Sequence, residues 1–136
     1  MASNRFPLTL LEGTFAVCKL DTNERTPGWV LDTAGPIACV VRTADELCII
    51  CAEEDVPRTA VKVERGFRAF KLEGPVPFTT VGVVSGLTKP LAEAGISVFV
   101  ISTFDTDYLM VNEKHVERAA KLLTAAGFVV EALPAS

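Results

Sequence analysis

The chain has 136 residues, of which 49% are hydrophobic and 22% charged, a composition typical of a folded globular protein rather than a disordered one. A net charge of −4 provides no basic surface for nucleic acid or for an anionic membrane. No apolar run approaches the roughly 20 residues that cross a bilayer, and residues 1–7 lack the apolar segment of a secretion signal. We therefore expect a cytoplasmic protein that binds neither nucleic acid nor membranes.

The first half of the chain has the pattern of a small β-rich unit. Runs of β-forming residues are separated by turn-forming residues, and Pro57 limits any helix after residue 52 to a short one. The strands expected here are residues 8–20 with a break at Gly13, 37–42, 47–52 and 63–72.

Residues 73–77, Glu-Gly-Pro-Val-Pro, end the last of these strands, because proline cannot donate a hydrogen bond to a sheet. This segment predicts a boundary between an N-terminal unit, residues 1–74, and a C-terminal unit, residues 75–136.

The second half predicts alternating strands and helices. Apolar residues recur at helical spacing in 87–94 and 113–126, and Gly95 and Gly127 follow these helices as end signals. Pro90 is expected in the first turn of the earlier helix, where backbone N–H groups have no intrahelical partner. The expected strands are 78–84, 96–102, 107–111 and 128–133, which gives the order β-α-β-β-α-β of the ferredoxin-like split βαβ motif.

The two halves also share an internal echo. When the chain is shifted by 60 residues without gaps, glycines, hairpin corners and helix starts coincide. The matching pairs include Gly35 and Gly95, Thr43 and Thr103, Asp45 and Asp105, Glu53 and Glu113, and Val56 and Val116. This echo predicts a duplication of one structural unit.

Four cysteines, Cys18, Cys39, Cys48 and Cys51, raise the question of a metal site. Cys48 and Cys51 are spaced as half of a zinc site, but structural zinc needs four ligands on converging turns. Both lie in a predicted strand, where residues three apart point to opposite faces. The chain has a single histidine, so we predict reduced thiols and neither a metal nor a cofactor.

The sequence resembles the ACT domain family. The resemblance rests on Gly-Leu-Thr-Lys-Pro-Leu-Ala-Glu-Ala-Gly-Ile at 86–96, on Val-Phe-Val-Ile-Ser-Thr-Phe-Asp-Thr-Asp-Tyr-Leu-Met-Val at 98–111, and on Thr-Phe-Ala-Val-Cys-Lys-Leu at 14–20. It implies an α+β fold of two tandem ferredoxin-like βαββαβ units with antiparallel sheets and helices on one face, as in cytosolic arginine sensors. It also implies an amino acid effector between units and a homodimer.

The resemblance places the effector on the loop between the first strand and the first helix of the second unit. The candidate residues are Val84, Ser85, Gly86, Leu87 and Thr88, with Ile96 after the helix. Helix N-terminal amides are unpaired donors suited to a carboxylate, and Gly86 would permit a close approach of the ligand. An ordinary strand-to-helix turn would explain the same residues.

The polar corner Thr103, Phe104, Asp105, Thr106 and Asp107 is the second candidate region. Its carboxylates suit an ammonium or guanidinium group and its hydroxyls add donors. Aspartate and threonine also favour hairpin corners because their side chains bond the local backbone, and Asp45 occupies the matching corner of the first half.

No catalytic constellation accompanies these residues. His115 lies in a predicted helix turn, and the sequence has no recognisable nucleophile motif or phosphate loop. We therefore predict a non-enzymatic regulatory protein that senses a free amino acid. The alternatives are a ligand-free dimerisation or protein-interaction module and a small-molecule enzyme on the same fold.

Overall fold

The computed structural model describes residues 6–33 and 35–132, and it divides the chain into two compact units. The contiguous unit comprises residues 13–67, and the composite unit comprises the described residues before Gly13 and after Phe67. This division differs from the expected boundary at residue 74. The reason is that β1 (Leu8–Leu10) pairs with the second part of β5 (Lys62–Leu72), not with the strands of the contiguous unit.

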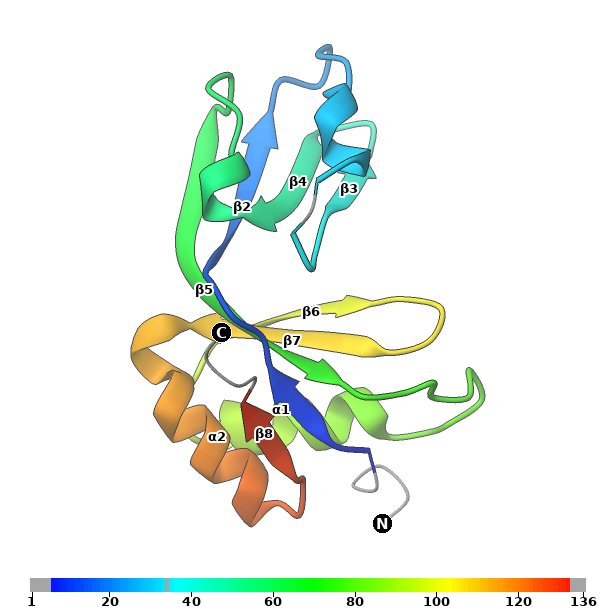
Figure 1. The fold of residues 1–136 in the computed structure, drawn as a ribbon, viewed down its shortest axis with the longest axis vertical. Helices are drawn as coiled ribbons and strands as arrows, with labels where there is room; N and C mark the ends of the chain where they lie inside the picture. The colour runs from blue at the N-terminus through cyan, green and yellow to red at the C-terminus, as the bar shows by residue number, and fades with distance from the viewer. Residues whose placement is uncertain (1–5, 34, 133–136) are drawn as a thin grey trace. The chain divides into compact units, whose positions relative to one another are not determined.

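The composite unit is built on a sheet with the strand order β6-β7-β5-β1-β8 (Figure 1). Its further strands are β6 (Val98–Ser102), β7 (Asp107–Asn112) and β8 (Val130–Ala132). β1 runs antiparallel to β5, with Leu8 opposite Leu72, and parallel to β8, with Leu8 opposite Val130. β1 is thus inserted between the first and last strands of a βαββαβ unit.

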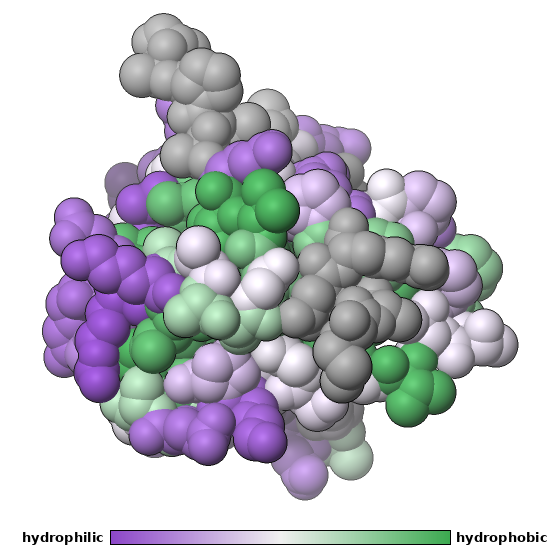
Figure 2. Space-filling model, turned by 90° about the horizontal axis from the view of Figure 1, so that it is seen from below, coloured by the Kyte–Doolittle hydropathy of each residue, from purple (hydrophilic) through white to green (hydrophobic). Residues whose placement is uncertain are grey.

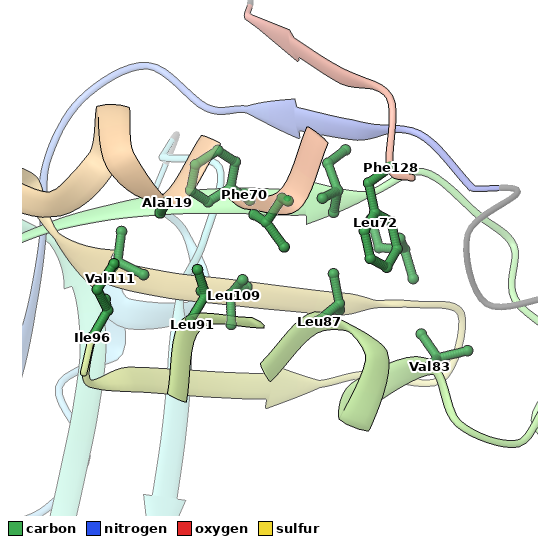
Figure 3. Packing of buried hydrophobic residues seen from close by; sticks show 12 residues of the cluster. Phe70, Leu72, Val83, Leu87, Leu91, Ile96, Leu109, Val111, Ala119 and Phe128 are labelled. Atoms are coloured by element: carbon green, nitrogen blue, oxygen red, sulfur yellow. The ribbon is translucent and has the colours of Figure 1, made fainter. Parts of the chain in front are cut away.

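Helices α1 (Val83–Glu93) and α2 (Val116–Ala125) cover one face of this sheet, and the 3-10 turn η4 (Glu113–His115) leads into α2. α1 buries Val83, Leu87 and Leu91, which recur every four residues and therefore lie on one helix face. They pack with Ala119 and Leu123 of α2 and with residues of β5 and β7, as Figure 3 shows. The α+β, ferredoxin-like prediction is confirmed.

The outward face of α2 is polar. Glu117, Arg118 and Lys121 are exposed there, and Figure 2 shows hydrophilic side chains gathered on the side where α2 lies. Within the part of the chain that the structure describes, no helix is long and apolar enough to cross a membrane.

The contiguous unit has the strand order β3-β4-β2-β5. Its strands are β2 (Phe15–Leu20), β3 (Cys39–Arg42), β4 (Leu47–Ala52) and the first part of β5, and its 3-10 turns are η2 (Gly28–Leu31) and η3 (Glu53–Asp55). Its core contains Cys18, Leu20, Val30, Leu47, Ile49 and Cys51.

The 60-residue echo has a structural counterpart in the hairpins of the two units. β4 at 47–52 corresponds to β7 at 107–112, and η3 at 53–55 corresponds to η4 at 113–115. The corners also match, since Thr43 N donates to the Glu46 carbonyl at 2.9 Å and Thr103 N donates to the Thr106 carbonyl at 2.8 Å. The echo therefore marks residues with the same structural role in the two hairpins, but not Gly35 and Gly95, since only Gly95 has a positive φ and follows an α-helix.

The strand predicted at 78–84 is wrong. Residues 78 and 79 form a turn in which Thr80 N donates to the Pro77 carbonyl, and α1 begins at Val83. The Val-Gly-Val-Val run predicts a strand only ambiguously, because a short apolar run fits a strand or a buried helix face equally well. The same error misplaced Pro90, which lies inside α1 rather than in its first turn.

The other predicted elements differ from the structure mainly at their ends. The strands at 96–102 and 128–133 begin later, as β6 and β8, and residue 133 lies outside the described residues. The predicted helix 113–126 is divided into η4 and α2.

Candidate ligand-binding site

A pocket of about 390 Å³ lies in the composite unit, where the start of α1 meets the corner between β6 and β7. Three segments line it: the turn before α1, the first turn of α1, and the β6–β7 corner. The lining residues are Val76, Pro77, Phe78, Thr80, Gly82, Val83, Val84, Ser85, Ser102, Thr103, Phe104, Thr106 and Asp107. Its volume is within the range of small-molecule sites, about 300–1,000 Å³.

The first turn of α1 gives the pocket a donor-rich end. Gly82 is the N-cap residue, with φ of 85°, and its carbonyl accepts from Gly86 N at 2.9 Å and from Ser85 Oγ at 3.1 Å. The amides before Gly86 belong to the first turn, where an α-helix has no backbone acceptor for them. The helix dipole adds a partial positive charge, so this end suits an anion.

Asp107 gives the pocket a negative group. Its side chain is 9% exposed, and its Oδ1 accepts a hydrogen bond from Ser102 Oγ at 2.6 Å. The neighbouring Thr106 is also buried, and its hydroxyl donates to the Leu72 carbonyl of β5. No lysine, arginine or histidine is among the described residues that line the pocket. Asp107 therefore lines the pocket without a cationic side chain among its described neighbours in the lining.

An aromatic pair also lines the pocket. The rings of Phe78 and Phe104 are stacked, with centroids 5.7 Å apart and planes at 30°. The two residues are 81% and 82% exposed. The pocket thus combines a helix N-terminus, one carboxylate and an apolar aromatic surface.

Of the residues predicted to bind a ligand, six line this pocket: Val84, Ser85, Thr103, Phe104, Thr106 and Asp107. The other five are Gly86, Leu87, Thr88, Ile96 and Asp105, and they do not line it.

Each of these five has another position in the fold. Leu87 and Ile96 lie in the core, and the Thr88 hydroxyl donates to the Val84 carbonyl within α1. The Gly86 amide donates a hydrogen bond to the Gly82 carbonyl, and it is Gly82, one turn earlier, that lines the pocket. Asp105 is exposed, and its backbone carbonyl accepts from Val76 N at 2.7 Å.

Thr103 of the polar corner and Thr43, its match in the other unit, hold a turn with their side chains. Thr103 Oγ1 accepts from Thr106 N at 3.3 Å, as Thr43 Oγ1 accepts from Glu46 N at 3.1 Å in the other unit. These threonines therefore hold equivalent turns.

Several corner residues that line the pocket differ between the two units, whereas Thr103 lines it and matches Thr43. Ser102, Phe104 and Asp107 correspond to Arg42, Ala44 and Leu47 under the 60-residue shift. Leu47 is buried in the core of the contiguous unit, whereas Asp107 lines a pocket. Comparison of the two repeats, position by position, would have singled out Ser102, Phe104 and Asp107, although not Thr103, which has a turn role and also lines the pocket.

Seven lining residues were missed: Val76, Pro77, Phe78, Thr80, Gly82, Val83 and Ser102. All but Ser102 fall in the segment that was read as a linker followed by a strand. Once α1 is known to begin at Val83, the same residues become the turn before a helix N-terminus.

The four cysteines lie in the contiguous unit, and none of them lines this pocket. Cys51 faces the core from β4, whereas Cys48 on the same strand is only half buried, as expected for side chains three residues apart on a strand. Burial raises the pKa of all four thiols and brings that of Cys51 to about 12. These thiols are therefore weak nucleophiles at neutral pH.

Comparison with known proteins identifies the class. A family model described as an ACT domain matches residues 62–125, and a model described as an N-terminal domain matches residues 13–59. The solved structure of the protein Atu0741 from Agobacterium tumefaciens is 34% identical, with 96% of each chain covered and a TM-score of 0.86. Residues 62–125 therefore match an ACT domain, and the chain as a whole belongs to the same family as the Agobacterium protein.

More distant structures share the fold. A Vibrio cholerae protein of unknown function, named a possible transport protein, is 19% identical over 92% of each chain, with a TM-score of 0.69. The regulatory subunit of aspartate kinase from Thermus flavus is 7% identical over 88% of this chain and 96% of that chain, with a TM-score of 0.61. No curated protein matches the sequence.

Proposed function

We propose that this chain is a non-catalytic regulatory protein that senses a free amino acid, which binds in the pocket between the start of α1 and the β6–β7 corner. The observation that carries the proposal is that one pocket contains a helix N-terminus and a buried carboxylate. A free amino acid carries the two complementary charges.

The ligand's carboxylate would accept hydrogen bonds from the first-turn amides of α1, and its ammonium would pair with Asp107. A charge-assisted hydrogen bond to a carboxylate with little solvent contact is stronger than the same bond in water. Asp107 replaces Asp105 as the proposed amine partner, because Asp105 is exposed and does not line the pocket.

A regulatory rather than a catalytic role is supported by the fold and by the chemistry of the lining. The fold occurs in a subunit named as regulatory in the Thermus flavus aspartate kinase. The described lining has neither histidine nor cysteine, and His115 lies in η4, outside the pocket.

The test is isothermal titration of the protein with each common amino acid, on the wild type and on two variants. Asp107→Asn should weaken binding of the effector by about tenfold or more, since a hydrogen bond to a charged group contributes about 1.5–3 kcal/mol. Asp105→Asn is the matched control, because it removes an equal charge from the same corner outside the pocket.

Binding that survives Asp107→Asn but is lost in Asp105→Asn would place the amine elsewhere. Absence of binding by any amino acid at millimolar concentration would refute the sensing proposal.

A homodimer is the second part of the proposal. β3 and β6 lie at edges of the described sheets, and unpaired strand edges are ready sites for pairing with another chain. The expectation that the effector lies between ACT units stays a prediction. Sedimentation velocity with and without the effector should show a dimer, and a monomer at high micromolar concentration under both conditions would contradict it.

A protein-interaction module is the competing function, and the exposed side chains of Phe78, Val81 and Phe104 favour it. Exposed apolar groups of this kind often mark a docking surface. If this function is correct, no amino acid will raise the melting temperature, and Val81→Ala will weaken capture of a partner as much as Phe104→Ala does.

A further inference from the structure

The stacked pair of Phe78 and Phe104 is an unusual surface feature. Each ring is more than four-fifths exposed, although exposed aromatic area is unfavourable in water. Both residues line the pocket, whereas the still more exposed Val81 does not. The pair therefore provides an apolar surface that a bound molecule would cover.

Backbone contacts connect the two turns that carry the rings. Val76 N donates to the Asp105 carbonyl at 2.7 Å, which ties the segment that carries Phe78 to the corner that carries Phe104. Gly74 packs against the same corner so closely that an added Cβ would lie 2.8 Å from the Asp105 carbonyl oxygen. The two rings thus belong to connected turns, and a backbone that is ordered before binding reduces the entropy lost on binding.

The corresponding corner of the contiguous unit has no such ring. Ala44 occupies the position of Phe104 under the 60-residue shift. Phe104 is therefore not required for the turn itself, which Thr43 and Thr103 hold in the same way in both units.

We infer that the aromatic pair selects an amino acid with an aromatic side chain, that is phenylalanine, tyrosine or tryptophan. The inference rests on the proposed function and adds the ligand class. With the ligand's carboxylate at α1 and its ammonium on Asp107, the side chain is left with Phe78 and Phe104 as its large apolar contacts. Aromatic rings stack favourably at centroid separations of 4.5–7 Å.

The charges of the lining support this choice. An acidic side chain would meet Asp107 and no cationic side chain among the described lining residues. A basic side chain would compete with the ligand's own ammonium for that single carboxylate. A neutral planar side chain avoids both conflicts.

The experiment is titration of the wild type with phenylalanine, tyrosine, tryptophan, leucine, lysine and aspartate. An aromatic amino acid should bind most tightly. Phe104→Leu and Phe78→Leu keep an apolar side chain but remove a ring, and each should weaken aromatic binding by about threefold to tenfold. Leucine binding should change little in these variants. Val81 lies on the segment that carries Phe78 but does not line the pocket. Val81→Ala should therefore leave the binding of aromatic amino acids and of leucine unchanged.

Tighter binding of lysine, aspartate or leucine than of every aromatic amino acid would overturn this inference and leave the amino acid proposal standing. Equal losses of aromatic binding in Val81→Ala and in the two ring variants would also overturn it. If no amino acid binds, the inference falls together with the proposed function. Circular dichroism and melting temperatures of the variants should match the wild type, because the substituted side chains are exposed.

Discussion

Asp107 and Leu47 occupy matching positions in the two structural units, but their side chains have different roles. Each begins the second strand of its hairpin, β7 or β4, and each is buried. A leucine there adds to a hydrophobic core, whereas a carboxylate needs hydrogen-bond partners, of which Ser102 supplies one. A carboxylate retained at a buried position is more readily explained by a ligand than by stability.

The corner threonines allow a matched prediction. Thr43→Val and Thr103→Val should each lower the free energy of unfolding by about 1 kcal/mol, because each removes a hydroxyl that accepts from a turn amide. Urea denaturation of the two variants measures these losses of unfolding free energy. A loss confined to Thr103→Val would mean that the two corners are not equivalent.

The thiol of Cys51 predicts how stability depends on pH. Its pKa is about 12 in the folded chain against 9.0 for an unperturbed cysteine, mainly because burial disfavours the thiolate. Above pH 9 the unfolded chain loses this proton and the folded chain keeps it, so stability falls as the pH rises from 9 towards 12. The loss of unfolding free energy reaches about 1.4 kcal/mol at one pH unit above the pKa of this thiol in the unfolded chain.

Denaturant unfolding between pH 8 and pH 10 measures this loss. Cys51→Val, which keeps an apolar side chain of similar size, should make the decline with pH smaller. An unchanged decline in this variant would assign the effect to other groups.

At the scale of elements, helix α1 shows why part of the site was hidden in the sequence. The hairpin strands, the second helix and the polar corner were predictable, because alternation, helical spacing and turn residues each give a distinct pattern. The start of α1 was not, because Val83 and Val84 favour strands locally and only the packing of Val83 with Leu87 and Leu91 makes them helical. Tertiary packing is not visible in a short segment.

The two glycines at the ends of α1 give a prediction. Gly82 and Gly95 have φ of 85° and 76°, and neither would bring an added Cβ into a close contact. Substitution by alanine should therefore cost about 1–2 kcal/mol at each, from backbone strain alone. Only Gly82→Ala should also weaken effector binding, because only Gly82 lines the pocket.

Thermal denaturation and titration of both variants separate the two effects. Equal weakening of binding in Gly95→Ala would show that the binding change follows from lower stability rather than from the pocket.

For the whole molecule, β5 is the strand that belongs to both units, and the division falls within it between Phe67 and Arg68. We therefore expect one cooperative unfolding transition. Ile49→Ala and Leu109→Ala, at matching buried positions in the two cores, should each lower the free energy of unfolding by about 2–5 kcal/mol. Calorimetry should show one shifted peak for each variant, and two separate peaks would show that the units unfold independently.

The position of β1 in its sheet has a consequence for the newly made chain. All the strands of the contiguous unit lie before residue 73, so this unit can leave the ribosome and fold while later residues are still being added. β1 is made before the strands of the contiguous unit. One edge of β1 stays unpaired until β8 has been made, because residue 8 pairs with residue 130. Contacts between residues so far apart in sequence also form slowly. The unit with the candidate pocket is thus begun before the contiguous unit and completed after it, because its sheet closes only once residues 130–132 have been made.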